Sequence, residues 1–76
     1  TASEAQRLMR ALREEYAGEQ VDLTEGLRVS WDDGSWLHVR PSNTELVIRV
    51  VAEADDPATA EARAARALEV IRRPQG

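Results

Sequence analysis

The sequence predicts a small α+β domain, in which an antiparallel sheet carries two helices packed on one of its faces. Both ends of the 76-residue chain have the apolar spacing of amphipathic helices. Between them, apolar residues alternate with polar ones, which is the period of half-buried strands. An Asp-Gly pair between two of these strands predicts a hairpin, and therefore antiparallel pairing.

The first helix is expected over residues 3–17, where arginines and glutamates fill the faces that the apolar residues leave free. Ser3 followed by Gln6 has the form of a capping box, and Gly18 is placed for a left-handed C-terminal cap. The helix is interpreted as an ordinary core-packing element. Its apolar positions are Ala5, Leu8, Met9, Leu12 and Tyr16.

Three strands are expected after this helix. In "EGLRVSW", residues 25–31, apolar side chains alternate inward, and Asp33-Gly34 then predicts a type I′ turn. The second strand is "SWLHVR", residues 35–40. The third, "ELVIRVVAEA" at 45–54, is the longest and most apolar, so we expect it at or near the centre of the sheet.

The last helix is expected to begin with Asp56 as N-cap and Pro57 at the first helical position. Arg72 and Arg73 fall in its last turn, where cations interact favourably with the helix dipole. Its narrow apolar stripe is made mostly of small residues, which allow a helix to lie close to a sheet. The stripe consists of Ala60, Ala64, Ala67, Leu68 and Ile71.

The composition excludes several classes of function. The formal net charge is −4 and no basic cluster is long enough to follow a phosphate backbone, so no nucleic-acid partner is expected. There is no cysteine, and the single histidine, His38, does not make a zinc site alone. The acidic run "EADD" at 53–56 has no second cluster to complete a magnesium site. No apolar run approaches about 20 residues, so no membrane partner and a cytoplasmic location are expected.

The polar insert "RPSNTE", residues 40–45, is the candidate functional site. Arg40 offers five donors in a planar fork. Ser42 and Thr44 offer hydroxyl groups, and Asn43 offers an amide. Together with the backbone N–H groups of a tight loop, these donors suit the acceptor oxygens of a phosphate. The alternative is a purely structural loop, because the same residue types are common in turns and strand-end arginines often pair with carboxylates.

Several other residues allow two interpretations. Trp31 and Trp36 either pack across strands or form a platform for a sugar ring. His38 is either an exposed bystander or a switchable cation beside the loop. Arg49 shares a strand face with Glu53 and is interpreted as half of a surface or helix-contacting ion pair, too far down the strand to be a ligand.

The stretch "EGLRVSWDDGSWLHVRPSNTELVIRVVAEA" resembles the C-terminal domain of the α-D-phosphohexomutases, which include phosphomannomutases, phosphoglucomutases and phosphoglucosamine mutases. The resemblance covers residues 21–72 well and the first helix loosely. Asn43, where the glucosamine branch usually has glycine, favours the mannose and glucose branch. Glu25 and Leu46 depart from the usual aspartate and proline. The matching positions are Gly26, Gly34, Trp36, Arg40 through Glu45, Glu53 and Ala54.

The resemblance implies that residues 1–76 form one domain, the C-terminal domain of a longer four-domain isomerase, with a fold similar to that of the TATA-binding protein. Such an enzyme interconverts hexose 1-phosphates and 6-phosphates, using a phosphoserine and a magnesium ion in its other domains.

Carried over residue by residue, the resemblance implies that Arg40, Ser42, Asn43 and Thr44 grip the phosphate of the phosphosugar that is not transferred. The chain alone is then expected to contain no catalytic residue, metal or cofactor. Its partners are the phosphosugar and the other domains of its own protein. The alternative function is a free-standing small module that binds anions or another protein.

Overall fold

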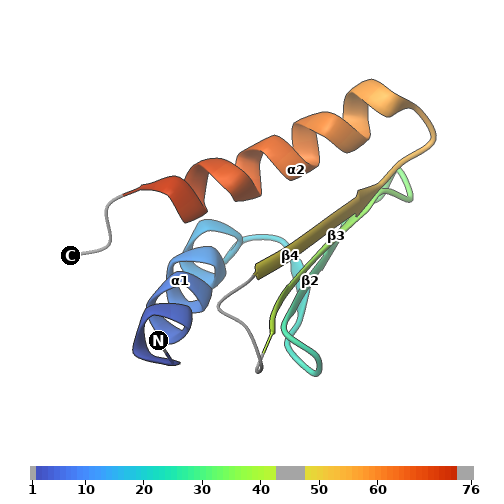
Figure 1. Ribbon diagram of the computed structural model, residues 1–76. Coiled ribbons are helices and arrows are strands. Elements are labelled where there is room, and N and C mark those ends of the chain that lie inside the picture. Colours follow the sequence, from blue (N-terminus) through green and yellow to red (C-terminus); the bar gives the residue numbers. More distant parts are fainter. Residues whose placement is uncertain (1, 43–47, 74–76) are drawn as a thin grey trace.

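The chain folds into one antiparallel sheet with both helices on the same face, as Figure 1 shows. The computed structural model describes residues 2–42 and 48–73. The strands lie in the order β1-β2-β3-β4, and each pairs antiparallel with its neighbour. The predicted fold class is therefore confirmed. The elements are α1 (Ala2–Glu15), β1 (Gln20–Asp22), β2 (Leu27–Ser30), β3 (Trp36–Pro41), β4 (Ile48–Glu53) and α2 (Pro57–Arg72).

The first strand, β1, is an addition to the three that were predicted. It is only three residues long, and all of its residues are exposed. A strand of this kind has no alternation of buried and exposed positions, so apolar periodicity does not reveal it. Its pairing with β2, from Gln20 opposite Ser30 to Asp22 opposite Arg28, makes it one edge of the sheet.

The strand expected at the centre of the sheet, β4, forms the other edge, so that prediction is wrong. The central strands are β2 and β3, whose inward residues Leu27, Val29, Leu37 and Val39 are fully buried. No residue of β4 is buried to that degree, and Val51 on its outer face is 49% exposed. The apolar content of β4 therefore reflects side chains on both of its faces and not a central position.

The turn between β2 and β3 also differs from the prediction. A type I′ turn needs positive φ at both central residues, but only Gly34 has it, at 85°. The connection is a three-residue loop, because Gly34 N–H donates to the Trp31 carbonyl (3.1 Å) and Trp31 N–H donates to the Ser35 carbonyl (3.0 Å). The Asp33 carboxylate accepts from Ser35 N–H at 2.8 Å, which holds Asp33 in an Asx-turn with negative φ.

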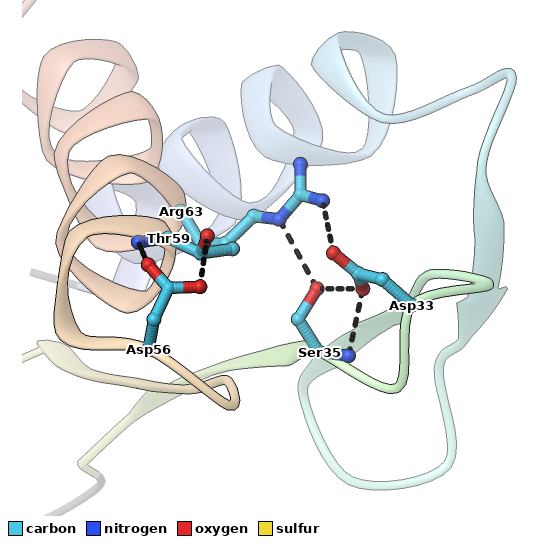
Figure 2. A network of polar contacts seen from close by, with 5 residues as sticks. All are labelled: Asp33, Ser35, Asp56, Thr59 and Arg63. Carbon is cyan, nitrogen blue, oxygen red and sulfur yellow. Dashed lines mark hydrogen bonds and ion pairs between the residues drawn. The ribbon is translucent and has the colours of Figure 1, made fainter.

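The predicted cap of α2 is confirmed, and those of α1 are wrong. Asp56 has an extended backbone and accepts from Thr59 N–H at 2.8 Å and from its hydroxyl at 2.7 Å, as Figure 2 shows. In contrast, α1 already includes Ser3, and Gly18 lacks the positive φ of a left-handed cap.

The core lies between the inner face of the sheet and the two helices. Of the predicted apolar stripes, Leu12, Tyr16 and Ala67 are fully buried. The last helix adds Val70, which the predicted stripe did not include. Partly buried side chains of β4 pack against the same cluster. The buried members are Met9, Leu12, Tyr16, Leu27, Val29, Leu37, Val39, Ala67 and Val70.

The sheet has two ends with different surroundings. At the hairpin end, which we define as residues 31–35, α2 begins close by, and Arg63 reaches the Asp33 carboxylate (3.4 Å) and the Ser35 hydroxyl (3.3 Å), as Figure 2 shows. At the loop end, which we define as residues 24–26, 40–42 and 48–49, β3 ends and β4 begins. Within the described residues, no helix is both long and apolar enough to cross a bilayer.

Candidate functional site

Two arginines face each other at the loop end of the sheet. Arg40 near the end of β3 lies directly opposite Arg49 near the start of β4 in the antiparallel register. Both are exposed, and within the described residues neither forms an ion pair with a carboxylate. Like charges placed directly opposite on a sheet are destabilising, so this pair is a cost to the fold unless an anion joins it.

The alternation of the strands explains why both arginines point away from the core. Leu37 and Val39 are buried on the inner face, so His38 and Arg40 lie on the outer face of β3. The same alternation in β4 places Arg49 on the outer face, where antiparallel pairing sets it beside Arg40. The fold thus brings two guanidinium groups from separate strands to one spot.

An open hollow of about 370 Å³ lies at this point. Its described lining consists of Arg40, Pro41, Ser42 and Arg49. The volume is near the lower end of the range of small-molecule sites, and the polar groups are hydrogen-bond donors with no carboxylate among the described lining residues. Such a hollow is suited to a small anion with several acceptor oxygens.

The structure brings together two of the four predicted ligands and adds one that was not predicted. Arg40 and Ser42 line the hollow, whereas Asn43 and Thr44 lie outside the described residues. The interpretation of Arg49 as an ion-pair partner of Glu53 is wrong, because residues four apart on a strand are roughly 13 Å apart along it. Glu53 lies opposite Trp36, at the other end of β4.

The two tryptophans are distant from the hollow. Trp31 packs against the core, in a T-shaped pair with Tyr16 (ring centroids 6.2 Å apart) and with the Arg63 guanidinium 3.9 Å from its centroid. Trp36 carries the Arg28 guanidinium 4.6 Å from its ring centroid. Both rings belong to the hairpin half of the sheet, so the interpretation as packing residues agrees with their contacts.

No part of the described chain has the ligands of a metal centre. Within residues 2–42 and 48–73, no three histidine or carboxylate side chains are grouped to hold an ion. Of the acidic run at 53–56, Asp56 is engaged as the N-cap of α2, and its hydrogen bonds from Thr59 lower the pKa of its carboxyl group. The described lining of the hollow offers hydrogen-bond donors and positive charge.

Comparison with known proteins identifies the family. Residues 2–70 match the family model of the phosphoglucomutase/phosphomannomutase C-terminal domain. The chain belongs to this family. A probable phosphoglucosamine mutase of Methanopyrus kandleri is 40% identical over 62 residues, which cover 82% of this chain and 13% of the relative. A phosphomannomutase of Sinorhizobium fredii is 42% identical over 51 residues, covering 67% of this chain and 11% of the relative.

A phosphopentomutase of Thermococcus kodakarensis is 62% identical over 29 residues, which cover 38% of this chain and 6% of the relative. The chain thus spans only about a tenth of the length of these relatives, in the range 6–13%. Their names agree on phosphosugar mutases and differ in the sugar. The hollow described above lies at the loop end of the sheet of this domain.

Arg49 is the site residue that sequence reasoning missed. In two antiparallel strands joined by a loop, paired positions have a constant sum, and the observed register pairs 40 with 49 as it pairs 36 with 53. The signal was therefore the equal distance of the two arginines from the middle of the loop. This equal distance predicts that the two arginines are paired only when the register of the two strands is known.

Proposed function

We propose that this chain is the substrate-phosphate-binding domain of a phosphohexomutase, an enzyme that interconverts hexose 1-phosphates and 6-phosphates. The observation that carries the proposal is the pair of opposed arginines in a donor-lined hollow, in a chain of this domain family. A phosphate dianion between the two guanidinium groups relieves their repulsion and accepts charge-assisted hydrogen bonds from both.

Within the proposal, each residue has a defined role. Arg40 and Arg49 hold the phosphate from two strands, with the planar fork of each guanidinium directed at its oxygens. Ser42 adds a hydroxyl donor from the end of β3. Asn43 and Thr44 are assigned as further ligands by the family resemblance alone.

The domain then positions its substrate and does not react with it. By gripping the phosphate that stays in place, it holds the sugar so that its other end is presented for phosphoryl transfer elsewhere in the protein. Enzymes of this kind are expected to use a magnesium ion, but the described residues contain no carboxylate cluster that could hold one. The proposed role of this domain therefore involves no metal.

The preferred hexose is a narrower part of the proposal. Asn43 favours the mannose and glucose branch, and glucosamine is the competing outcome because several relatives carry that name. Titration with mannose 1-phosphate, glucose 6-phosphate and glucosamine 6-phosphate compares the three directly.

An amide chemical-shift titration of the chain with glucose 6-phosphate tests the proposal. We expect shifts at the loop end with a Kd near or above ~1 mM, because association costs offset most of a small ligand's interactions. Arg40→Ala and Arg49→Ala should each weaken binding by about tenfold or more, since hydrogen bonds to charged groups contribute roughly 1.5–3 kcal/mol. Arg40→Lys should keep only part of the affinity, because lysine lacks the planar fork of the guanidinium group.

Arg10→Ala is the matched control. It removes the same charge from the exposed surface of α1, where Arg10 lies 3.9 Å from the Glu14 carboxylate. Binding that falls equally in Arg10→Ala and Arg40→Ala reflects net charge alone and refutes the site. Shifts that cluster at the hairpin end refute it as well.

A further inference from the structure

The turn before β2, residues 24–26, presses against the backbone that carries Arg40. Gly26 has φ of 72°, and a Cβ at this position would collide with the carbonyl oxygen of Val39 and lie 3.3 Å from the Cα of Arg40. These are backbone atoms of β3, which cannot move aside as a flexible side chain can. Glycine thus permits both the left-handed conformation and the close approach.

The contact of Gly26 with β3 lies just beyond the last residue pair between β2 and β3. On the β2 side, the ladder with β3 ends where Leu27 pairs with Val39, one residue before Arg40. On the β4 side the ladder continues through Arg40 and Arg49. Without Gly26 against it, Arg40 has a neighbouring strand on one side only.

A side-chain hydrogen bond ties the same turn to β3 a second time. His38 Nε2 donates to the carbonyl oxygen of Glu25 at 2.6 Å. His38 lies two residues before Arg40 and on the same outer face of the strand. The turn is therefore anchored to β3 on either side of Val39.

The turn is itself held in shape by its own residues. The Asp22 carboxylate at the end of β1 accepts from Thr24 N–H at 2.8 Å, in an Asx-turn. Hydrogen bonds from Thr24, first from its side chain and then from its backbone N–H, lower the pKa of the Asp22 carboxyl group. The Asx-turn hydrogen bond therefore restrains the backbone that connects β1 to β2.

We propose that residues 24–26 form a brace that sets the position of Arg40 opposite Arg49, and that Gly26 and His38 are positioning residues of the anion site. The inference rests on the proposed function, because it assumes that the two arginines share one phosphate. Two guanidinium groups of like charge repel each other, and the brace opposes the displacement of β3 that this repulsion favours. Neither positioning residue needs to touch the ligand.

The two left-handed glycines provide a matched pair of variants. Gly34→Ala places a side chain at φ of 85° with nothing within 4 Å, so it introduces backbone strain alone. Gly26→Ala introduces the same kind of strain and also displaces the Val39–Arg40 backbone. The difference between them isolates the effect of the contact.

The experiment is an amide-shift titration of the chain and both variants with inorganic phosphate, with urea unfolding measured on each. We expect both variants to lose stability, Gly34→Ala to keep the Kd of the unchanged chain, and Gly26→Ala to raise it by about tenfold through loss of one well-placed arginine contact. Equal phosphate affinities of folded Gly26→Ala and Gly34→Ala overturn the brace.

Variants of His38 keep the inference testable if Gly26→Ala does not fold. His38→Ala removes the bond to Glu25 and should raise the Kd severalfold, and His38→Gln, whose amide N–H can replace Nε2, should restore it without a charge. Val51→Ala is the control, because Val51 is the exposed cross-strand partner of His38 on β4. If His38→Ala binds phosphate as Val51→Ala does, or glutamine gives no rescue, the brace is wrong.

Failure of the brace and failure of the proposed function give different results. A chain without phosphate-induced shifts at residues 40–42 and 48–49 has no anion site, which refutes the proposed function. A chain that binds phosphate there, with an affinity insensitive to Gly26 and His38, keeps the proposed function and loses the brace.

Discussion

Tyr16 is a fully buried residue whose hydroxyl group has no hydrogen-bond partner in the part of the chain that the structure describes. The Arg66 guanidinium lies 4.4 Å from the centroid of its ring, which forms a T-shaped pair with the Trp31 ring. Burial raises the pKa of the phenol, so the group stays neutral. The ring contributes packing, whereas the hydroxyl carries the desolvation cost of an unpaired polar group.

Tyr16→Phe should therefore stabilise the domain. Removing an unpaired buried hydroxyl recovers part of a penalty of roughly 1–3 kcal/mol, and we expect a gain of about 1 kcal/mol. For a domain of this size, that gain raises Tm by about 4–8 °C. Thermal unfolding followed by circular dichroism measures it.

Tyr16→Leu is the control for the ring, because it deletes the aromatic contacts together with the hydroxyl and should destabilise by about 2–4 kcal/mol. A Tyr16→Phe variant that melts below the unchanged chain means that the hydroxyl does have a favourable interaction.

At the scale of elements, two arginines of α2 attach the helix to the rest of the molecule. Arg63 reaches the hairpin, where it donates to Asp33 and Ser35, as Figure 2 shows. Its guanidinium also lies over the Trp31 ring. Arg66 reaches the end of α1, where it donates to the Glu15 carboxylate at 2.9 Å and to the Glu15 carbonyl at 3.1 Å. These contacts link α2 to the β2–β3 hairpin and to the end of α1.

Arg66→Met should loosen the attachment of α2 to α1. Methionine keeps much of the apolar stem but loses the ion pair, the backbone hydrogen bond and the cation over Tyr16. Because the Arg66 side chain is 38% exposed, solvent reduces the loss to about 1–2 kcal/mol. The measurement is the urea midpoint at constant m-value.

The comparison variant is Arg10→Met, whose ion pair with Glu14 is 76% exposed on both sides and should contribute under about 0.5 kcal/mol. Equal urea midpoints for the two variants would show that the Arg66 contacts do not hold the helices together.

At the scale of the whole molecule, four carboxyl groups couple stability to pH. Hydrogen bonds lower the pKa of each in the folded state: from Arg66 at Glu15, and from Thr24, Ser35 and Thr59 at the three aspartates. A lowered folded-state pKa means that the unfolded chain binds protons more readily. Their contribution is complete above the unfolded values near ~4 and is lost as the pH falls through the folded values. The aspartates are Asp22, Asp33 and Asp56.

We therefore expect the urea midpoint to be constant from about pH 7 to pH 5 and to fall steadily below about pH 4, at fixed ionic strength. A double variant, Asp33→Asn with Asp56→Asn, should start from lower stability and fall less steeply in acid. A midpoint that stays level or rises between pH 5 and pH 3 contradicts this coupling.

Local chemistry in the sequence was sufficient to determine the fold class and to point to two residues that line the candidate site. Apolar periodicity located both helices and three strands, Asp56-Pro57 located the start of α2, and the loop residues identified Arg40 and Ser42. These features depend on neighbours within a few residues, where side-chain spacing and capping chemistry act directly.

Only the tertiary structure decided how the strands are ordered and which residues meet at the loop end. Placing β4 at an edge, pairing Arg49 with Arg40 and setting Gly26 against the Arg40 backbone all require the register of strands that are distant in the chain. Register is determined by the packing of the whole inner face against two helices, and a shift of one residue would turn every side chain to the other face. The local sequence of a strand contains the alternation of apolar and polar residues, but it does not say which strand pairs with it. The partner strand is selected by the burial energy of the complete core.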